Sequence, residues 1–338
     1  TGESHAGWYV LIGICAAVPC LMVLVLLLMS ADIVFAYLLV RFAGVFRFPA
    51  KLFRILLMLV FGFLSSYCGV RYVQKHAADI KPSAGKTAEP LIAIAFTAPI
   101  AVLYLLFSAI QIVYLFIGNM QLPAGVTYAE YARRGFFQLL FVCVLNLAAV
   151  LSIQSYFKEN RVLKALLLAI SGCTLIMTAS SACRMLLYIR AYQLTFLRVS
   201  VLVALAVIAL LMAGVIAKIV KPQFPLFRYG FVLAGAVYLV FSFSHVDYFI
   251  AAYNLTHTSW EASGEETVDY SYLYTLSTDA APAIEKYAGK SGAADYRKQG
   301  WYQLYCEANE EALNETGVRT YNVSHAVAKQ LLMEDNRE

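Results

Sequence analysis

Residues 8–29 read WYVLIGICAAVPCLMVLVLLLM, and this stretch decides the fold class of the chain. It contains no charged side chain, and it reaches the roughly 20 apolar residues that a helix needs to cross about 30 Å of hydrocarbon. Trp8 and Tyr9 at its start suit the aromatic belt at a membrane interface. The stretch therefore predicts a membrane-spanning helix.

Six further stretches have the same character. Across the chain 61% of residues are apolar and the mean hydropathy is +0.68, whereas an ordinary soluble domain is roughly 45–50% apolar. We therefore expect an all-α fold, a polytopic transmembrane helical bundle of about seven spans. The segment 30–48 after the first span is expected to be an interfacial helix or a short re-entrant segment. The six further spans are expected at 53–70, 91–117, 136–157, 163–187, 198–217 and 229–250.

Charge separates the chain into two regions. Residues 1–250 carry 19 Lys and Arg against 7 Asp and Glu, while residues 251–338 carry 7 against 14. The first region is thus +12 and the second −7. Such asymmetry is typical of one region in lipid and another in water. We expect a transmembrane helical domain over 1–254 and a small, acidic, Tyr-rich soluble C-terminal domain with helical structure over 255–338.

Cysteines and histidines give no sign of a metal or disulfide framework. Six of the seven cysteines lie in apolar stretches, where a thiol behaves as a small hydrophobe, and only Cys306 lies in the polar tail. There is no Cys-x-x-Cys pair and no Cys/His cluster. We expect no metal, no cofactor and no nucleic-acid partner; the expected partners are the lipid bilayer and other membrane proteins. Thr1 is not an initiator methionine, which indicates a chain that is processed, truncated or part of a longer one, and leaves an upstream extension open.

Strongly polar residues in or beside the spans gather on one side of the predicted bundle. If the first span enters from side A, odd-numbered spans end on side B and even-numbered spans begin there. Polar groups are costly in hydrocarbon, so each is a candidate functional residue. Asp32 and His245 fall on side B, whereas side A has ordinary loop lysines and arginines. The candidate ligand- or partner-binding residues on side B are Gln111, Tyr114, Glu130, Arg133, Arg134, Arg184, Tyr188, Arg198 and Asp247.

Several of these candidates also have a structural interpretation. Thr127-x-x-Glu130 matches a capping box, in which the two side chains bond free amides at a helix start. Arg133 and Arg134 equally suit snorkelling to lipid headgroups. Both interpretations stay open beside the functional one.

Five side chains near the ends of spans five and six recur at helical spacing. A polar stripe of that length is costly on a lipid-facing helix, which favours a stripe that faces the bundle interior. Asp247 is then most simply a counter-ion for one of its arginines. The stripe comprises Arg184, Tyr188, Ala191, Thr195 and Arg198.

The run Tyr-Ala-Glu-Tyr-Ala-Arg-Arg-Gly-Phe-Phe at 128–137 is long enough to be specific. It resembles a signature of a bacterial family of multi-pass membrane proteins of unknown function. The resemblance extends from the first span to about residue 285, and it implies a bacterial membrane location without an established activity. Further similar runs lie at 30–35, 107–116, 184–198 and 276–282.

The sequence contains no motif that identifies a chemical reaction. His-Glu-x-x-His, Gly-x-Ser-x-Gly and Gly-x-Gly-x-x-Gly are all absent from it. Our hypothesis is a non-enzymatic membrane component, a sensor or a subunit of a membrane complex, that binds a ligand or partner through the side B residues and the C-terminal domain. The alternatives are an intramembrane enzyme, for which Glu130 and His245 faintly resemble a glutamate/His-dependent protease, and a transporter, although no repeated halves are visible.

Lysine and arginine counts suggest the orientation of the chain. Loops on side A carry ten of these residues and loops on side B carry nine. Four on side B, namely Arg133, Arg134, Arg184 and Arg198, belong to the candidate site, and setting them aside leaves ten against five. By the positive-inside rule, we expect side A in the cytoplasm of a bacterial cell and the C-terminal domain outside.

Overall fold

The computed structural model describes residues 2–43, 88–113, 136–257, 259–260, 266–267, 270–288, 299–314 and 322–333. Contacts within the chain define two compact units. The first comprises Thr1–Cys183 with Ile208–Gly230, and the second comprises Arg184–Val207 with Phe231–Glu338. The division into these units is based on contacts within the chain, and it passes through three helices. The boundary expected at residue 254 is based on polarity instead. The contacts do not test it, and it stays a prediction.

The fold is an all-α, multi-pass membrane architecture, as the sequence predicts. Among the described residues, six helices are long and apolar enough to cross a membrane. The expected span at 53–70 lies outside the described residues. The six helices are α1 (Gly2–Ala31), α4 (Pro90–Gln111), α6 (Phe136–Tyr156), α7 (Arg161–Tyr192), α8 (Phe196–Val220) and α9 (Leu226–Phe243).

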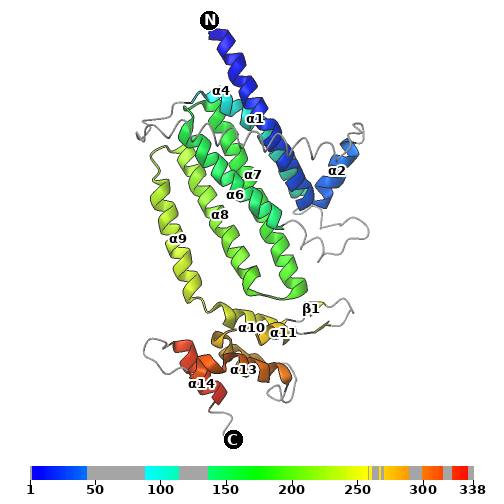
Figure 1. Cartoon of the computed structure of the whole chain (residues 1–338), viewed down its shortest axis with the longest axis vertical. Coiled ribbons are helices and arrows are strands. Elements are labelled where there is room, and N and C mark those ends of the chain that lie inside the picture. The colour runs from blue at the N-terminus through cyan, green and yellow to red at the C-terminus, as the bar shows by residue number, and fades with distance from the viewer. Residues whose placement is uncertain are drawn as a thin grey trace. The chain divides into compact units, whose positions relative to one another are not determined.

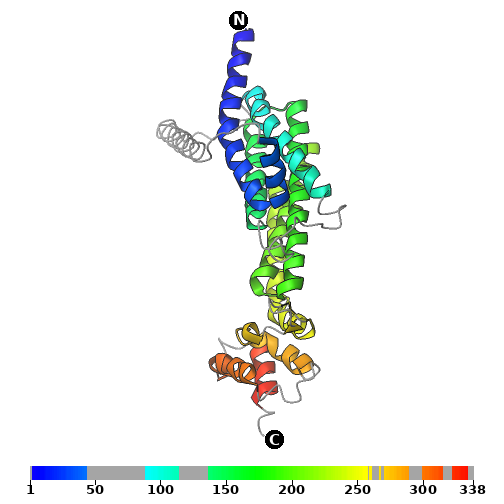
Figure 2. The same ribbon diagram turned by 90° about the vertical axis from the view of Figure 1, so that its right-hand side faces the viewer.

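In the first unit, α1 packs against both α4 and α6 (Figures 1 and 2). The two helices come close at Gly13, where an added Cβ would lie 2.5 Å from the carbonyl oxygen of Ile92 and 2.6 Å from Cβ of Ala95. Small residues allow this closeness between membrane helices, whose association depends on van der Waals contact. The same unit buries large apolar side chains such as Phe107, Leu139 and Met177.

A short helix, α2 (Ile33–Ala43), follows α1 after a one-residue break. Asp32 occupies the break, and its Oδ1 accepts a hydrogen bond of 2.8 Å from the backbone amide of Phe35. That bond is the usual role of an aspartate at a helix N-cap. Within the segment 30–48, the described residues 30–43 are helical apart from Asp32, and whether the segment is interfacial or re-entrant stays a prediction.

In the second unit, the expected span at 229–250 is wrong as a single helix. α9 ends at Phe243, and α10 (Val246–Thr256) begins after a break. At the break, Ser244 Oγ donates to the carbonyl oxygen of Phe241 at 2.8 Å, and His245 adopts a left-handed conformation with φ of 46°. A residue with positive φ ends a helix, so Asp247 lies on α10 and not at the end of a span.

The C-terminal helices of the second unit lie together in Figure 2, and buried apolar side chains of these helices form one core. Its fully buried members include Ile250, Leu273, Ile284 and Tyr305. Two strands of two residues each, β1 (Ser259–Trp260) and β2 (Glu266–Thr267), pair antiparallel and leave the fold class unchanged. The helical elements after α10 are α11 (Tyr270–Leu273), the 3₁₀ helix η2 (Thr278–Ala280), α12 (Ala281–Ala288), α13 (Gly300–Asn314) and α14 (Val323–Met333).

The close approach of α1 and α4 predicts the effect of a single methyl group. Gly13→Ala should destabilise the protein by about 1–3 kcal/mol, because overpacking forces the two backbones apart. The measurement is the midpoint of thermal unfolding in detergent. Gly7→Ala on the same helix is the matched control, because nothing lies within 4 Å of a Cβ at Gly7. Equal midpoints for the two variants would contradict the packing argument.

Candidate functional site

A buried chain of polar side chains links the break before α2 with α4 and α7 in the first unit. Gln111 Nε2 donates to Asp32 Oδ2 at 2.7 Å, and Ser180 Oγ donates to Gln111 Oε1 at 2.6 Å. All three side chains are at most 2% exposed. The amide of Gln111 therefore has one partner on each side, and its direction is fixed by both.

A second buried chain joins α4, α6 and α7. Tyr104 donates its hydroxyl proton to Asn146 Oδ1 at 2.6 Å, and Asn146 Nδ2 donates to Thr174 Oγ1 at 2.9 Å. Thr174 in turn donates to the carbonyl oxygen of Ile170 on its own helix. Each polar group therefore has a partner inside the protein, as helices in a membrane require.

Of the nine candidate residues, only Gln111 has a described place in the first unit. Tyr114, Glu130, Arg133 and Arg134 lie outside the described residues. The structure adds Asp32, which the candidate set omits although it falls on the same predicted side. The sequence marks Asp32 by its carboxylate, which comes directly after an apolar span. A carboxylate at such a position is explained by a helix N-cap or by a functional role.

The other four candidates, Arg184, Tyr188, Arg198 and Asp247, lie in the second unit. Arg184 is completely buried on α7. Tyr188 follows one turn later, and the guanidinium carbon of Arg198 lies 4.4 Å from the centre of its ring. This contact is a cation–π interaction, which the structure brings together from two different helices.

The residues of the expected polar stripe lie on two helices and the turn between them, since α7 ends at Tyr192 and α8 begins at Phe196; that the stripe faces the bundle interior stays a prediction. Gln193 has a left-handed φ of 64°, which ends the helix. Arg198 Nη1 donates to the carbonyl oxygens of Tyr192, at 2.5 Å, and Gln193. Arg198 thus caps the C-terminal end of α7, where a cation also compensates the helix dipole.

Asn254 of α10 holds the turn between α7 and α8. Its Oδ1 accepts from the amide of Leu194 at 2.8 Å, and its Nδ2 donates to the carbonyl oxygen of Leu194 at 2.9 Å. Gln193 Nε2 donates to the carbonyl oxygen of His257 at 2.8 Å, just beyond the end of α10. The amide and the carbonyl group of Leu194 have no helical partner in the turn, and the side chain of Asn254 therefore bonds both of them.

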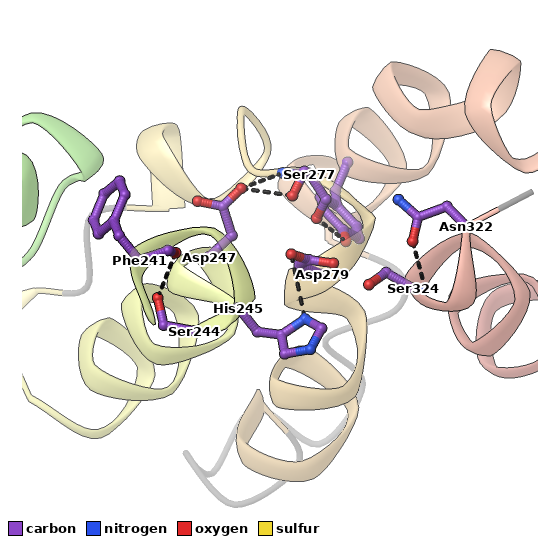
Figure 3. Close-up of polar contacts among 9 residues, drawn as sticks. Phe241, Ser244, His245, Asp247, Ser277, Asp279, Asn322 and Ser324 are labelled. Atoms are coloured by element: carbon purple, nitrogen blue, oxygen red, sulfur yellow. Dashed lines mark hydrogen bonds and ion pairs between the residues drawn. The ribbon is translucent and has the colours of Figure 1, made fainter. Parts of the chain in front are cut away.

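Asp247 has a different partner from the one expected. Its Oδ2 accepts hydrogen bonds from the amide of Ser277 at 3.1 Å and from Ser277 Oγ at 2.6 Å, as Figure 3 shows. Among the described residues no arginine pairs with this carboxylate. The expectation of an arginine counter-ion is wrong, because the break at His245 moves Asp247 out of the span and beside the segment before η2.

A hollow of about 400 Å³ opens between the start of α10, η2 and the start of α14. Its apolar lining comes from Tyr248, Phe249, Pro282, Val323 and Val327, and its polar lining from Ser244, His245, Thr278, Asp279 and Ser324. Figure 3 shows His245 reaching Asp279, with 3.5 Å between Nδ1 and Oδ2. Volumes of roughly 300–1,000 Å³ with a few convergent polar groups are typical of ligand sites.

Two buried side chains of α13 fix the segment that carries Asp279. Tyr305 donates its hydroxyl proton to the carbonyl oxygen of Ser277 at 2.9 Å, and Asn309 Nδ2 donates to that of Leu276 at 3.1 Å. Burial raises the pKa of Tyr305, so its hydroxyl keeps its proton and remains a donor. The polar rim of the hollow is therefore held in place before any ligand arrives.

Comparison with known proteins gives a family and no activity. The family model described as "Domain of unknown function (DUF4153)" matches residues 1–287. The match ends at residue 287, close to residue 285, where the resemblance found in the sequence ends. No curated protein and no solved structure matches the chain.

The bonds of Asn254 predict a specific loss of stability. Asn254→Ala leaves the amide and carbonyl of Leu194 without these partners and should cost on the order of 1–3 kcal/mol. Hydrogen exchange of the intact protein in detergent should show faster exchange at the amide of Leu194. Thr256→Ala is the matched control on the same helix, because Thr256 Oγ1 donates to carbonyl oxygens of α10 itself. Unchanged exchange at Leu194 in Asn254→Ala would disprove the role.

Proposed function

The chain belongs to the DUF4153 family, and from that premise we propose that it is a non-enzymatic component of the bacterial cell membrane, a sensor or a subunit of a membrane complex. It binds a small ligand in the hollow beside α10. The observation that supports this proposal is the pairing of His245 with Asp279 at the rim of a partly apolar hollow. A ligand with an apolar body and a polar end matches that lining.

The position of α10 supports a sensing role. Its first residues, among them Tyr248, line the hollow, and Asn254 near its other end bonds the turn between α7 and α8. The helix is only 11 residues long. A ligand that moves the start of α10 therefore acts on the end of two helices through one rigid element, which is how a binding site controls a distant element.

The same hollow is less suited to hydrolysis. A serine nucleophile needs its Oγ within about 3 Å of a histidine nitrogen that takes its proton. Ser324 and His245 both line the hollow, but the polar partner of the His245 ring is the carboxylate of Asp279, and no hydrogen bond joins it to Ser324 among the described residues. The amide of Ser324 bonds Asn322 Oδ1 at 2.9 Å, which makes Ser324 part of the start of α14.

Filling the hollow tests the binding proposal. Val327→Trp should abolish binding, because the larger side chain occupies the space of the ligand. The measurement incubates the purified intact protein with a metabolite extract and identifies bound small molecules by mass spectrometry. Leu304→Trp is the matched control, since Leu304 is exposed on α13 and does not line the hollow. The proposal requires a molecule that wild type and Leu304→Trp retain and Val327→Trp loses; its absence would refute the proposal.

We also propose that the second unit's C-terminal helices lie outside the cell. Labelling of a cysteine on intact cells can test this orientation, but the natural cysteine of these helices, Cys306, is poorly suited to it. Cys306 is half-buried, and burial, with Glu285 and Glu307 nearby, raises the pKa of its thiol, although a hydrogen bond with Tyr302 lowers it. Because the thiolate is the reactive form, Cys306 should react with maleimide more slowly at neutral pH than an exposed cysteine. Its rate should keep rising at pH values where an ordinary thiol is already ionised.

An exposed neighbour provides the test of orientation. Gln303→Cys combined with Cys306→Ser places a thiol on the exposed face of α13. A maleimide that cannot cross membranes should label it rapidly on intact cells, and peptide mapping identifies the site. If labelling appears only after lysis, the C-terminal helices are in the cytoplasm and the proposed orientation is reversed.

A further inference from the structure

A second hollow, of about 370 Å³, lies in the first unit where four membrane-spanning helices end or begin. Its lining comes from the end of α6, the start of α7, the end of α8 and the start of α9. The apolar spans stop or start at Tyr156, Arg161, Val220 and Leu226. Because all four termini line one hollow, the hollow lies at the boundary between hydrocarbon and headgroups.

The lining is amphipathic in the way that a lipid is. Apolar side chains such as Leu163, Leu167 and Ile219 form one part of it, and the ammonium groups of Lys158, Lys164 and Lys218 form another. Lysine stems can cover apolar surface while their charged ends reach water or phosphate. A soluble anion would use the ammonium groups and leave the apolar part unused, whereas a phospholipid uses both.

Two of the three lysines of the hollow form ion pairs that are weak enough for an added anion to displace. Lys158 pairs with Glu89 at 2.5 Å and Lys164 with Glu159 at 2.7 Å, and the four side chains are between 38% and 52% exposed. Exposed ion pairs of this kind contribute only about 0–1 kcal/mol, so they yield readily to a stronger partner.

Lys218 differs from the other two lysines. Its Nζ donates to the carbonyl oxygen of Pro222 at 2.5 Å, and no described carboxylate pairs with it. The hollow therefore holds one ammonium group more than the two carboxylates of these pairs balance.

We propose that this hollow binds the phosphate headgroup of an anionic phospholipid, with Lys218 as its principal contact and Lys158 and Lys164 beside it. The part of the acyl chains next to the headgroup lies against Leu163, Leu167 and Ile219. Basic pockets between membrane helices bind anionic headgroups with about 1 kcal/mol for each lysine or arginine. The site lies in the first unit and shares no residue with the hollow beside α10, so it stands independently of the proposed function.

The test measures binding of fluorescent phosphatidylglycerol to the purified full chain in a neutral detergent. Lys218→Gln should weaken binding about fivefold, which is the affinity equivalent of one lysine near a headgroup. The triple variant of Lys158, Lys164 and Lys218 to Gln should weaken it by more than about a hundredfold. Lys221→Gln is the matched control, because it removes the same charge three residues away and does not line the hollow.

Three results would overturn the proposal. Phosphatidylcholine that binds as tightly as phosphatidylglycerol would remove the preference for an anionic headgroup. Lys221→Gln that weakens binding as much as Lys218→Gln would make the attraction a general surface effect. Glycerol phosphate that displaces the lipid completely would make a soluble phosphate the ligand. The single variant Lys218→Gln keeps the test valid even where the triple variant fails to fold.

Discussion

A polar side chain inside a membrane has no water to bond, and this constraint shapes the first unit more than any apolar contact does. Asp32 can interrupt the apolar chain between α1 and α2 because its carboxylate accepts from the amide of Phe35 and from Gln111. Gln111 can lie at the end of α4 because Ser180 of α7 satisfies its oxygen. Hydrogen bonds are directional and apolar contacts are not, so these bonds restrict how the helices can rotate about their axes.

The second unit meets the same constraint at helix ends. The last carbonyl groups of α7 have no helical partner, and Arg198 supplies one from the next helix. Leu194 receives both of its backbone partners from Asn254. Arg198 is close in sequence to the carbonyls it bonds, whereas Asn254 is 60 residues from Leu194 and ties this turn to α10. The stability of this turn rests on these bonds, and the proposed sensing role relies on the same bonds.

The existence of the spans could be predicted from sequence because apolar length is a local property, and α1, α4, α6, α7 and α8 follow it. The separation of the fifth and sixth spans was also expected, but the break at His245 was not, because His245 is a left-handed residue where glycine or asparagine is more usual. The partner of Asp247 also escaped prediction. Ser277 is 30 residues away, and only the fold brings it to the carboxylate. Asp32 was visible in the sequence, yet its role depends on Gln111, which is 79 residues distant.

The lysine-lined hollow also changes how the orientation is argued. The positive-inside argument compares ten basic residues on side A with five on side B. The count for side B leaves out the four arginines of the candidate site, whereas the count for side A leaves out no residue. If Lys158, Lys164 and Lys218 bind lipid, they too are held by function, and equal treatment leaves seven against five. The direction of the rule survives, although its margin narrows. Anionic lipid also attracts lysines to the cytoplasmic leaflet, so a headgroup site and the positive-inside rule have one electrostatic origin. The lysines of this hollow therefore favour side A in the cytoplasm on either interpretation.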